Sequence, residues 1–287
     1  MQVGIGLPAT IPGVDGKTVV DWARRADAAG FSSLGVIDRL VYPNYDPMIA
    51  LAAAAAATER IGLMPTVVLA PLWANTALLA KQALSLDRLS GGRFTLGVGL
   101  GARDDDFEAS GLPTGGRGRR LDEQLTELRR IWAGESLGYA GAIGPPMTKA
   151  GGPELILAGS VPASFRRAAE FGDGWIMGGG APDQFSTSAA AVDQAWAAAG
   201  REGSPKKLSL AYFALGADAD RHAQSYLHDY YAWLGPIADA IASSAAITPE
   251  AVGAYVTAFR DAGCDELIFQ PCSPDLEEVE LLAEAAL

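Results

Sequence analysis

The sequence predicts an α/β protein that folds as a (β/α)8 barrel. Eight short apolar segments alternate with longer segments of helical pattern, and the length of 287 residues suits one barrel of about 250 residues. Most of the apolar segments are hydrophobic almost throughout, as expected for parallel strands that are buried on both faces. An open, doubly wound sheet is the alternative. No linker rich in proline, serine or glycine divides the chain, so we expect one domain over residues 1–287.

Strands and helices are expected in turn along the chain. The expected strands are Gln2–Leu7, Ser33–Ile37, Gly62–Leu69, Arg93–Val98, Glu154–Ala158, Gly174–Met177, Leu208–Leu215 and Glu266–Phe269. The expected helices are Asp15–Ala29, Asp46–Thr58, Asn75–Leu89, Leu121–Ala133, Ala163–Phe171, Pro182–Ala199, Asp218–Ala242, Thr248–Ala262 and Asp275–Leu287. Two of these helices open on a capping residue followed by proline, which is typical of helix starts.

Two segments stand out from this alternation. Residues 134–152 form a long irregular loop, which in a compact domain is either functional or disordered. Residues 218–247 follow the seventh expected strand, where a helical segment can lean over the mouth of the barrel. We expect these two segments to determine the substrate.

Composition disfavours several classes of protein. The 34 acidic and 22 basic residues give a net charge of −12, which disfavours nucleic acid as a partner. No apolar run reaches the roughly 20 residues of a membrane span, and the first residues show a strand pattern without a signal core. We therefore expect a cytoplasmic protein with no membrane contact. The two cysteines and two histidines lack the spacing of a zinc site, so no metal is expected.

Three glycines alternate at the end of the fourth expected strand, at Gly97, Gly99 and Gly101. With Ala102 they match the G-x-G-x-x-G/A fingerprint of dinucleotide-binding folds, but that fingerprint needs a helix that begins at once. The aspartates at 104–106 would instead repel a phosphate. In a barrel, active sites lie at the C-terminal ends of strands, where a backbone without side chains lets a flat ligand approach. A glycine-rich turn without a ligand is the alternative.

A second glycine-rich stretch follows the sixth expected strand, in GDGWIMGGG at residues 172–180. Consecutive glycines can turn their N–H groups inward as an anion-binding nest, and phosphate sites of barrels commonly lie in the late loops. A site for a planar ring next to a site for a phosphate suits a flat, phosphorylated cofactor.

Several stretches resemble the bacterial-luciferase-like flavin monooxygenases. The most distinctive is DRLSGGRFTLGVGLG at 87–101, which is similar to the segment around the fourth strand of that family. The similarity continues at residues 26–40, 58–87, 119–135, 154–179 and 261–271, and so covers nearly the whole chain. It implies a bacterial-luciferase-like barrel that binds FMN or the deazaflavin coenzyme F-420. Members either insert one oxygen atom from O2 or transfer a hydride.

The resemblance implies which residues contact the cofactor. Val67 and Val68 match a bulge in the third strand that supports the flavin ring, often through a non-proline cis peptide; two ordinary buried valines are the alternative. Leu100 and Gly101 match positions beside the ring edge. The phosphate loops are matched by Gly159, Ser160, Gly178, Gly179 and Gly180.

Some positions depart from the family pattern. Ala181 stands where deazaflavin-dependent members often have a lysine, and Ala102 stands where they often have a glutamate. Leu100 stands where the luciferase subunit has an arginine. The phosphate would then depend on peptide N–H groups and on Ser160.

Asp38 and Arg39 directly follow the second expected strand, where deazaflavin-dependent members usually have Asp-His. The two side chains could orient a substrate or hydrogen-bond the flavin, or they could form an ion pair at the surface. The three aspartates at 104–106 could cap a short helix that ends near Ala109, or shape the entrance to the cofactor.

Aromatic residues and histidine crowd the segment after the seventh strand. His228 and Tyr230 are candidate proton donors for flavin oxygen chemistry or hydride transfer. Tyr226 and Trp233, with Trp73 after the third strand, are candidates for the wall of a substrate pocket. Core packing is the alternative for the aromatic residues.

We expect a reduced-FMN-dependent monooxygenase that acts on a small organic substrate with O2. A hydride-transferring oxidoreductase that depends on coenzyme F-420 is the close alternative, and a non-catalytic flavin-binding or scaffold protein is the third. No second nucleotide-binding domain for NAD(P)H is visible, so a separate flavin reductase would supply reduced flavin. Many members of the family are dimers or tetramers, so the resemblance also implies a homo-oligomer.

Overall fold

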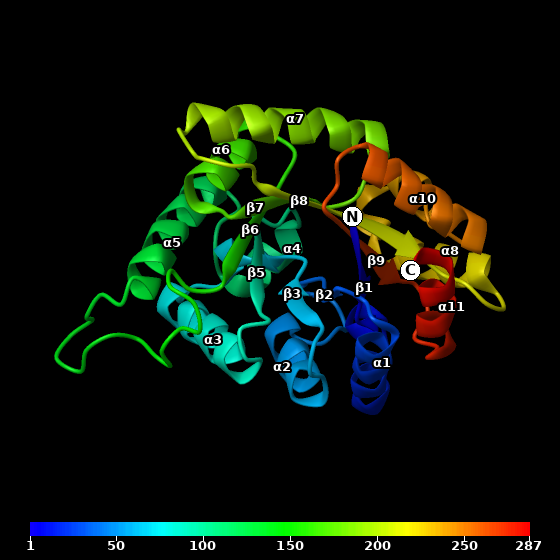
Figure 1. Ribbon diagram of the computed structural model, residues 1–287, viewed down its shortest axis with the longest axis horizontal. Coiled ribbons are helices and arrows are strands. Elements are labelled where there is room, and N and C mark those ends of the chain that lie inside the picture. Colours follow the sequence, from blue (N-terminus) through cyan, green and yellow to red (C-terminus); the bar gives the residue numbers. More distant parts are fainter.

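The computed structural model describes all 287 residues and shows a parallel sheet that closes into a barrel wrapped by helices (Figure 1). The sheet runs in the order β3-β2-β1-β9-β8-β7-β6-β5-β4, and the adjacent pairs are parallel. The strands are β1 (Gln2–Gly6), β2 (Ser33–Val36), β3 (Gly62–Pro65), β4 (Val68–Leu69), β5 (Thr95–Gly99), β6 (Glu154–Ala158), β7 (Gly174–Met177), β8 (Lys206–Phe213) and β9 (Glu266–Pro271).

The third strand of the barrel is divided into two pieces. β3 pairs with β2 on one side, and β4 pairs with β5 on the other. The peptide bond between Thr66 and Val67, which separates the pieces, is cis. A parallel bridge between Leu63 and Phe94 joins β3 to the chain just before β5 and closes the ring. The nine strands are therefore the eight expected strands with one broken, and the predicted (β/α)8 barrel is confirmed.

Eleven α-helices and three 3-10 helices follow the strands. The α-helices are α1 (Gly16–Ala29), α2 (Pro47–Ala57), α3 (Thr76–Leu89), α4 (Asp104–Ser110), α5 (Arg117–Trp132), α6 (Pro162–Phe171), α7 (Pro182–Ala198), α8 (Ala219–Tyr230), α9 (Ile237–Ser243), α10 (Pro249–Asp261) and α11 (Glu277–Ala286). The 3-10 helices are η1 (Pro8–Thr10), η2 (Ala70–Leu72) and η3 (Ala232–Leu234). The expected caps form, since Asp46 accepts from the N–H of Ile49 and Thr248 from that of Ala251.

The single helix expected over Asp218–Ala242 is wrong. The chain forms α8, η3 and α9 in succession, and α9 packs against α8. The break lies at Gly235, which has a φ of 57°, and at Pro236 after it. Glycine accepts a positive φ, and proline has no N–H to continue a preceding helix.

Three clusters of buried hydrophobic residues fill the fold, and one of them includes Tyr212, Tyr226 and Tyr230. A large core lies between the sheet and the helices and includes the fully buried Trp22, Trp132 and Trp175. A smaller layer lies inside the barrel and consists of Met64, Ile156, Ile176, Leu208, Leu210 and Ile268. This inner layer separates the two ends of the barrel.

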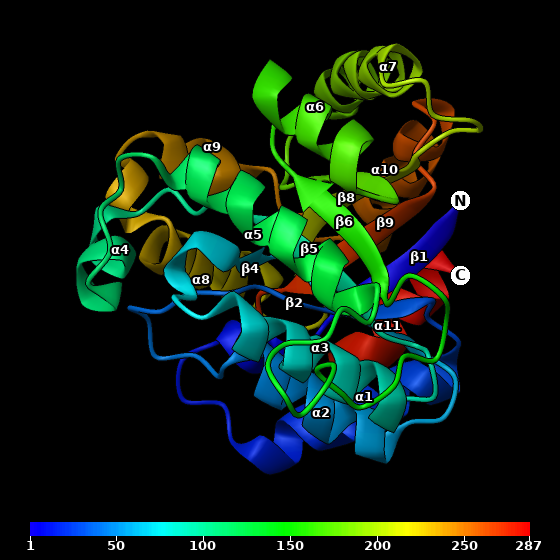
Figure 2. The same ribbon diagram turned by 90° about the vertical axis from the view of Figure 1, so that its left-hand side faces the viewer.

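Different elements gather at the two ends of the barrel. Figure 2 shows α4, α8 and α9 together at the end opposite the chain's N-terminus, where the strands finish. The loop 134–152 extends away from the barrel in Figure 1. Its last part lies at the strand starts, where the Thr148 hydroxyl donates to Asp87 at 2.6 Å and Lys149 lines a cavity, while residues 140–144 lie against the first turns of α3. That this loop helps to determine the substrate stays a prediction.

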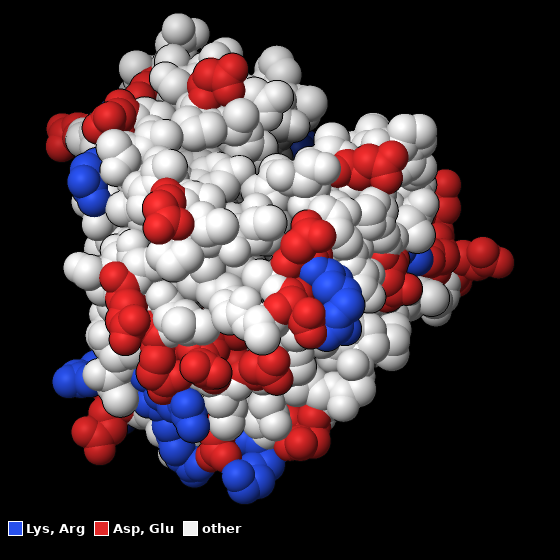
Figure 3. Space-filling view, turned by 90° about the vertical axis from the view of Figure 1, so that its right-hand side faces the viewer, with Lys and Arg blue, Asp and Glu red and all other residues white.

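The surface reflects the acidic composition. On the face shown in Figure 3, acidic side chains are more frequent than basic ones. None of the helices combines the length and the apolar character that a membrane crossing requires.

Candidate functional site

An apolar cavity opens at the C-terminal ends of β7 and β8, beneath α9. Its volume is about 640 Å³, within the range of small-molecule sites of roughly 300–1,000 Å³. Its walls include Leu210 and Tyr212 of β8 and Ile237 and Ile241 of α9, and its edge is the loop Gly178–Gly180. No charged side chain lines it.

The glycine loop at the edge of this cavity is open. A Cβ atom added to Gly178 or Gly179 would meet no other atom within 4 Å. The peptide N–H groups of Gly178, Gly179, Gly180 and Ser160 donate no hydrogen bond within the chain. Ser160 and the glycine loop precede the N-termini of α6 and α7. Free N–H groups at helix N-termini are suited to bind a phosphate.

The glycines of β5 have a different role from the one expected. A Cβ at Gly97 would lie 2.1 Å from the carbonyl oxygen of Pro65, and one at Gly99 would lie 2.5 Å from Cγ2 of Val67. Both glycines therefore make room for the broken third strand, and Val67 covers their backbone. The expectation that a flat ligand approaches this backbone directly is wrong for Gly97 and Gly99.

The two valines of the third strand face opposite ways. Val67 is partly exposed and packs on the inner apolar layer, so it forms part of the floor of the barrel mouth. Val68 is fully buried in the outer core and cannot offer its side chain to a ligand there. Leu100 and Gly101 are partly exposed beyond β5. Gly159, at a φ of 137°, lies close to Ser164, and its carbonyl accepts from the Trp175 indole at 2.7 Å.

Asp38 does not form the ion pair with Arg39 that was one expectation. Its carboxylate accepts hydrogen bonds from the Leu69 N–H at 2.9 Å and from the Trp73 indole at 3.4 Å. Burial raises the pKa of the Asp38 carboxyl to about 6, although these two hydrogen bonds oppose the shift. Asp38 thus positions the half-buried Trp73 and the end of β4 at Leu69.

Arg39 pairs with Asp106 instead. Its Nε atom lies 2.9 Å from Asp106, and the exposed fractions of the two side chains are only 6% and 1%. The same carboxylate accepts from the N–H of Val41 at 2.7 Å, and the Arg39 guanidinium lies 5.5 Å from the centre of the Tyr230 ring. The expected short helix forms as α4, but Arg103 is its N-cap residue and no side chain caps it, so the capping role expected for the three aspartates is wrong. Asp106 instead binds the loop after β2 to α4, a role that the sequence did not reveal.

Tyrosines form a cluster beside the cavity. The hydroxyls of Tyr212 and Tyr231 lie 2.7 Å apart, and both residues line the cavity. Tyr226 is buried and donates to Thr10 at 2.9 Å. Tyr230 is also buried, between Tyr231 and Tyr42. Burial raises the pKa of Tyr212 and that of Tyr231, so both keep their protons at neutral pH.

Sequence reasoning missed Tyr212 and Tyr231. Tyr212 lies in the continuous apolar pattern of its strand, and Tyr231 adjoins the expected candidate Tyr230. The position of Tyr212 at the C-terminal end of a barrel strand was the signal that could have found it.

His228 and Trp233 lie away from the cavity. The ring nitrogens of His228 contact the Gln224 carbonyl at 2.8 Å and Asp239 of α9 at 2.9 Å. The hydrogen bond with Asp239 raises the pKa of His228. Trp233 lies against Arg103 in a broad hollow of about 950 Å³ that also contains Tyr42.

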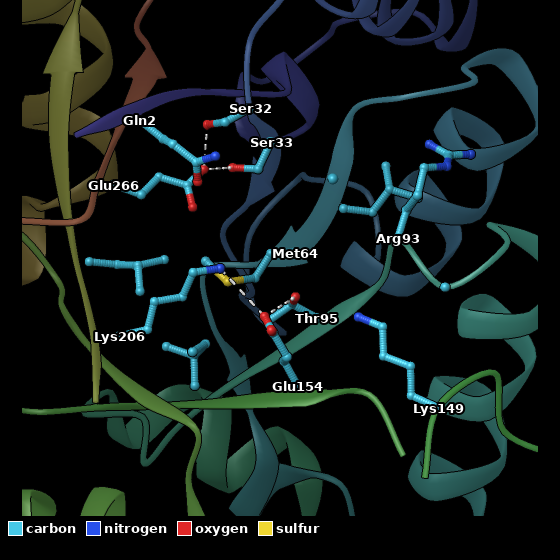
Figure 4. Close-up of a pocket in the computed structure, with 15 residues that line it drawn as sticks. Gln2, Ser32, Ser33, Met64, Arg93, Thr95, Lys149, Glu154, Lys206 and Glu266 are labelled. Carbon is cyan, nitrogen blue, oxygen red and sulfur yellow. Dashed lines mark hydrogen bonds and ion pairs between the residues drawn. The ribbon is translucent and has the colours of Figure 1, made fainter. Parts of the chain in front are cut away.

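A polar cavity of about 180 Å³ lies at the opposite end of the barrel (Figure 4). Glu266 accepts from the hydroxyls of Ser32 and Ser33, each at 2.6 Å. Across the cavity, Lys206 lies 3.4 Å from Glu154. These groups already pair with one another at the strand starts, where barrels carry structural residues and not active sites.

The closed barrel, with its apolar cavity and open glycine loop at the strand ends, has the architecture of the barrel enzymes. Within that class, the chain belongs to the family of luciferase-like monooxygenases, because residues 1–269 match that family. It is therefore a member of a family of flavin- or F-420-dependent oxidoreductases.

Two curated relatives match part of their own length. An uncharacterised protein of Mycobacterium tuberculosis is 34% identical over 173 residues, which cover 58% of this chain and 61% of that protein. The 5,10-methylenetetrahydromethanopterin reductase of Methanolobus tindarius is 28% identical over 201 residues, which cover 68% of this chain and 60% of that protein. The chain thus spans less than two thirds of the length of either relative.

Solved structures share the fold over almost the whole chain. Monooxygenase RslO1 from Streptomyces bottropensis has a TM-score of 0.77 at 24% identity, with 99% of this chain and 98% of that chain covered. An F-420-dependent secondary alcohol dehydrogenase in complex with an F-420-acetone adduct has a TM-score of 0.82 at 18% identity, with 99% and 97% covered. The oxygenating component of 3,6-diketocamphane monooxygenase from Pseudomonas putida, in complex with FMN, has a TM-score of 0.74 at 20% identity. The match covers 100% of this chain and 97% of that chain.

The residues at the mouth fit a phosphorylated flavin. The open glycine loop has free N–H groups and space for a phosphate, and the neighbouring cavity is large and apolar. A buried phosphate needs hydrogen-bond donors, which the loop has, while no lysine or arginine lines the cavity.

Proposed function

We propose that this chain is a monooxygenase that uses reduced FMN and O2 to oxidise a small, uncharged organic molecule. The observation that carries the proposal is the apolar cavity of about 640 Å³ that has the open glycine loop as its edge. Such a cavity combines a wall for an apolar molecule with N–H groups for a phosphate. The monooxygenases among the structural neighbours, one of them in complex with FMN, support this choice.

Charge favours FMN over coenzyme F-420. F-420 carries a longer anionic tail beyond its phosphate, whereas FMN ends at the phosphate. No lysine or arginine lines the cavity beside the glycine loop, and the net charge of the chain is −12. A longer anion would therefore meet no compensating cation at this place.

Hydride transfer with F-420 is the second candidate function. It is favoured by the 28% identity to a 5,10-methylenetetrahydromethanopterin reductase and by the likeness to an F-420-dependent dehydrogenase with a TM-score of 0.82. The same cavity and glycine loop would serve this function.

Each part of the mouth would have a distinct task. Bound reduced FMN would supply the chemistry with O2. The N–H groups of the glycine loop and of Ser160 would hold the phosphate, and Val67 would support the ring from the barrel floor. The apolar walls would exclude water from the reacting atoms. Asp38 would position Trp73, and Arg39 would position Tyr230.

The proposal can be tested by titrating FMN, riboflavin and F-420 into the purified protein, with flavin fluorescence as the readout. Gly178→Asp adds a negative charge where a side chain meets no other atom, so it should weaken FMN binding about tenfold or more through repulsion of the phosphate. Riboflavin has no phosphate and should bind this variant within about twofold of the wild type. Gly178→Asn is the neutral control and should bind FMN like the wild type.

If Gly178→Asp weakened the binding of FMN and of riboflavin equally, the proposed phosphate site at the glycine loop would be contradicted. A second measurement separates the two functions: with reduced FMN supplied by an added flavin reductase, the enzyme should consume O2 faster when substrate is present. Tight binding of F-420 with no response to O2 would favour hydride transfer instead.

A further inference from the structure

We propose that the hydroxyl pair Tyr212–Tyr231 recognises a single hydrogen-bond-accepting oxygen on an otherwise apolar, uncharged substrate. This inference rests on the proposed function, because it names the class of molecule that the same cavity accepts. Ketones, aldehydes and esters belong to this class, while carboxylates, phosphates and ammonium compounds do not.

The first observation is that the pair has one hydrogen without a partner. The two hydroxyl oxygens lie 2.7 Å apart, and neither hydroxyl makes another hydrogen bond within the chain. One hydroxyl donates to the other, so the accepting hydroxyl still has its own hydrogen to donate. The exposed fraction of Tyr212 is only 7%, and a buried donor without a partner is unfavourable. An acceptor atom on a ligand would satisfy it.

The second observation is that the other polar side chains of the cavity are either already paired or exposed. The Tyr255 hydroxyl donates to the Ser244 carbonyl at 2.7 Å, and the Ser244 hydroxyl donates to the Ile241 carbonyl at 2.7 Å. Gln184 is exposed and accepts from the Ala181 N–H at 3.1 Å. The tyrosine pair is therefore the buried side-chain donor in this cavity that remains free for a ligand.

The third observation is the absence of charge around the pair. The side chains that surround it are apolar, among them Leu210, Leu234, Ile237 and Ile241, and no ionised group lines the cavity. The nearby Arg39 is neutralised by Asp106 in a buried ion pair. An ionic ligand would lose its hydration without gaining a counter-ion, so the cavity disfavours charged molecules.

A matched set of probes tests this inference by binding alone. 2-Heptanone carries a carbonyl, 2-methyl-1-heptene has the same shape with a CH2 group in place of the oxygen, and heptanoate is an anion of similar size. We would measure their affinities by ligand-observed NMR, with the protein saturated with oxidised FMN and also without flavin. The wild type should bind the ketone about five- to tenfold more tightly than the alkene, and heptanoate most weakly.

Variants that lack one hydroxyl complete the test. Whichever of Tyr231→Phe and Tyr212→Phe removes the hydroxyl that donates to the ligand should weaken ketone binding about fivefold, and both should leave alkene binding unchanged, because only the ketone uses the donor. Tyr45→Phe removes a hydroxyl that donates to the Val14 carbonyl at 2.9 Å, away from the cavity, and is the control for loss of a tyrosine hydroxyl. Circular dichroism melting curves would verify that the variants fold.

The inference would be overturned if the wild type bound the alkene as tightly as the ketone, or bound heptanoate most tightly. It would also be overturned if both Phe variants kept the full preference for the ketone. These outcomes differ from failure of the proposed function, which would appear as absence of FMN binding in the titrations above. A ketone preference that persists without flavin would support the pocket whichever cofactor the enzyme uses.

Discussion

The two ends of the barrel differ in how they use charge. At the N-terminal end, a cavity of about 180 Å³ is lined by Glu154, Lys206, Glu266 and other polar groups. At the C-terminal end, the cavity of about 640 Å³ has no charged lining and an open glycine loop at its edge. The inner apolar layer lies between them.

This difference in charge indicates that the residues that stabilise the fold are separate from those that line the binding cavity. At the N-terminal end, charged and hydroxyl groups link strands that are not neighbours in the sheet, as Glu266 of β9 does with Ser33 of β2 across β1. At the mouth, the buried pair Arg39–Asp106 lies outside the apolar cavity and holds the loop after β2 to α4. The cavity itself is thereby left free of groups that the fold requires.

Removal of Asp106 should have the largest effect on stability. Asp106→Ala leaves Arg39 buried without its partner and removes an acceptor for the N–H groups of Leu40 and Val41. Loss of one member of a buried ion pair costs about 3–5 kcal/mol. Urea unfolding would measure this loss. Asp105→Ala is the control, because Asp105 is 39% exposed, pairs mainly with Arg103 and lies 4.0 Å from Arg39, so it should contribute less than about 1 kcal/mol. If the two variants lowered the free energy of unfolding equally, Asp106 would not be the carboxylate whose burial with Arg39 stabilises the fold.

The role of Asp106 illustrates what the sequence could not predict. Residues 104–106 are three identical side chains at the start of a helix, and only the position of α4 against the loop after β2 decides which one is buried. The local pattern also did not predict the break in the third strand, because residues 62–69 are mostly apolar and indicate one continuous strand. Only the family resemblance implied a bulge with a cis peptide at Val67 and Val68, and the cis peptide bond lies between Thr66 and Val67.

Other features followed from local patterns. The remaining strands, most helix starts and the open loop at Gly178–Gly180 agree with the apolar runs, the capping residues and the glycines. The roles of Gly97 and Gly99 could not be predicted from the sequence, because a glycine makes room equally well for a ligand or for another part of the chain. Here the occupant is Val67, from a different strand.

The second largest effect concerns pH and the buried Asp38. Its pKa is raised from 3.8 to about 6 in the fold, so between these pH values the unfolded chain releases a proton that the folded chain retains. Stability should therefore fall as pH rises through this window, by up to about 3 kcal/mol. Asp38→Asn keeps an acceptor for Leu69 and Trp73 without the charge. Urea unfolding should show the variant more stable than the wild type at pH 7 and nearly equal to it at pH 4.

Comparison of the variant with the wild type at each pH cancels the other carboxyl groups. Burial raises the pKa of Glu278 from 4.5 to about 7, so this residue also makes the free energy of unfolding fall as pH rises, over a slightly higher pH range. Glu278 is present in both proteins. If the difference in unfolding free energy between variant and wild type were the same at pH 4 and pH 7, the pKa of Asp38 would not be raised by folding.

The smallest effect is expected at the N-terminal end, and it tests whether the two ends are independent. Glu266→Gln keeps an oxygen acceptor for Ser32 and Ser33 but removes the negative charge from the hydrogen bonds, which should lower the unfolding free energy by about 1 kcal/mol. FMN affinity should stay within about twofold of the wild type, because the inner apolar layer separates this residue from the mouth. A larger change in FMN affinity, measured in the same titration as Gly178→Asp, would mean that the strand starts and the mouth respond to each other through the layer of Met64, Ile156 and Ile268.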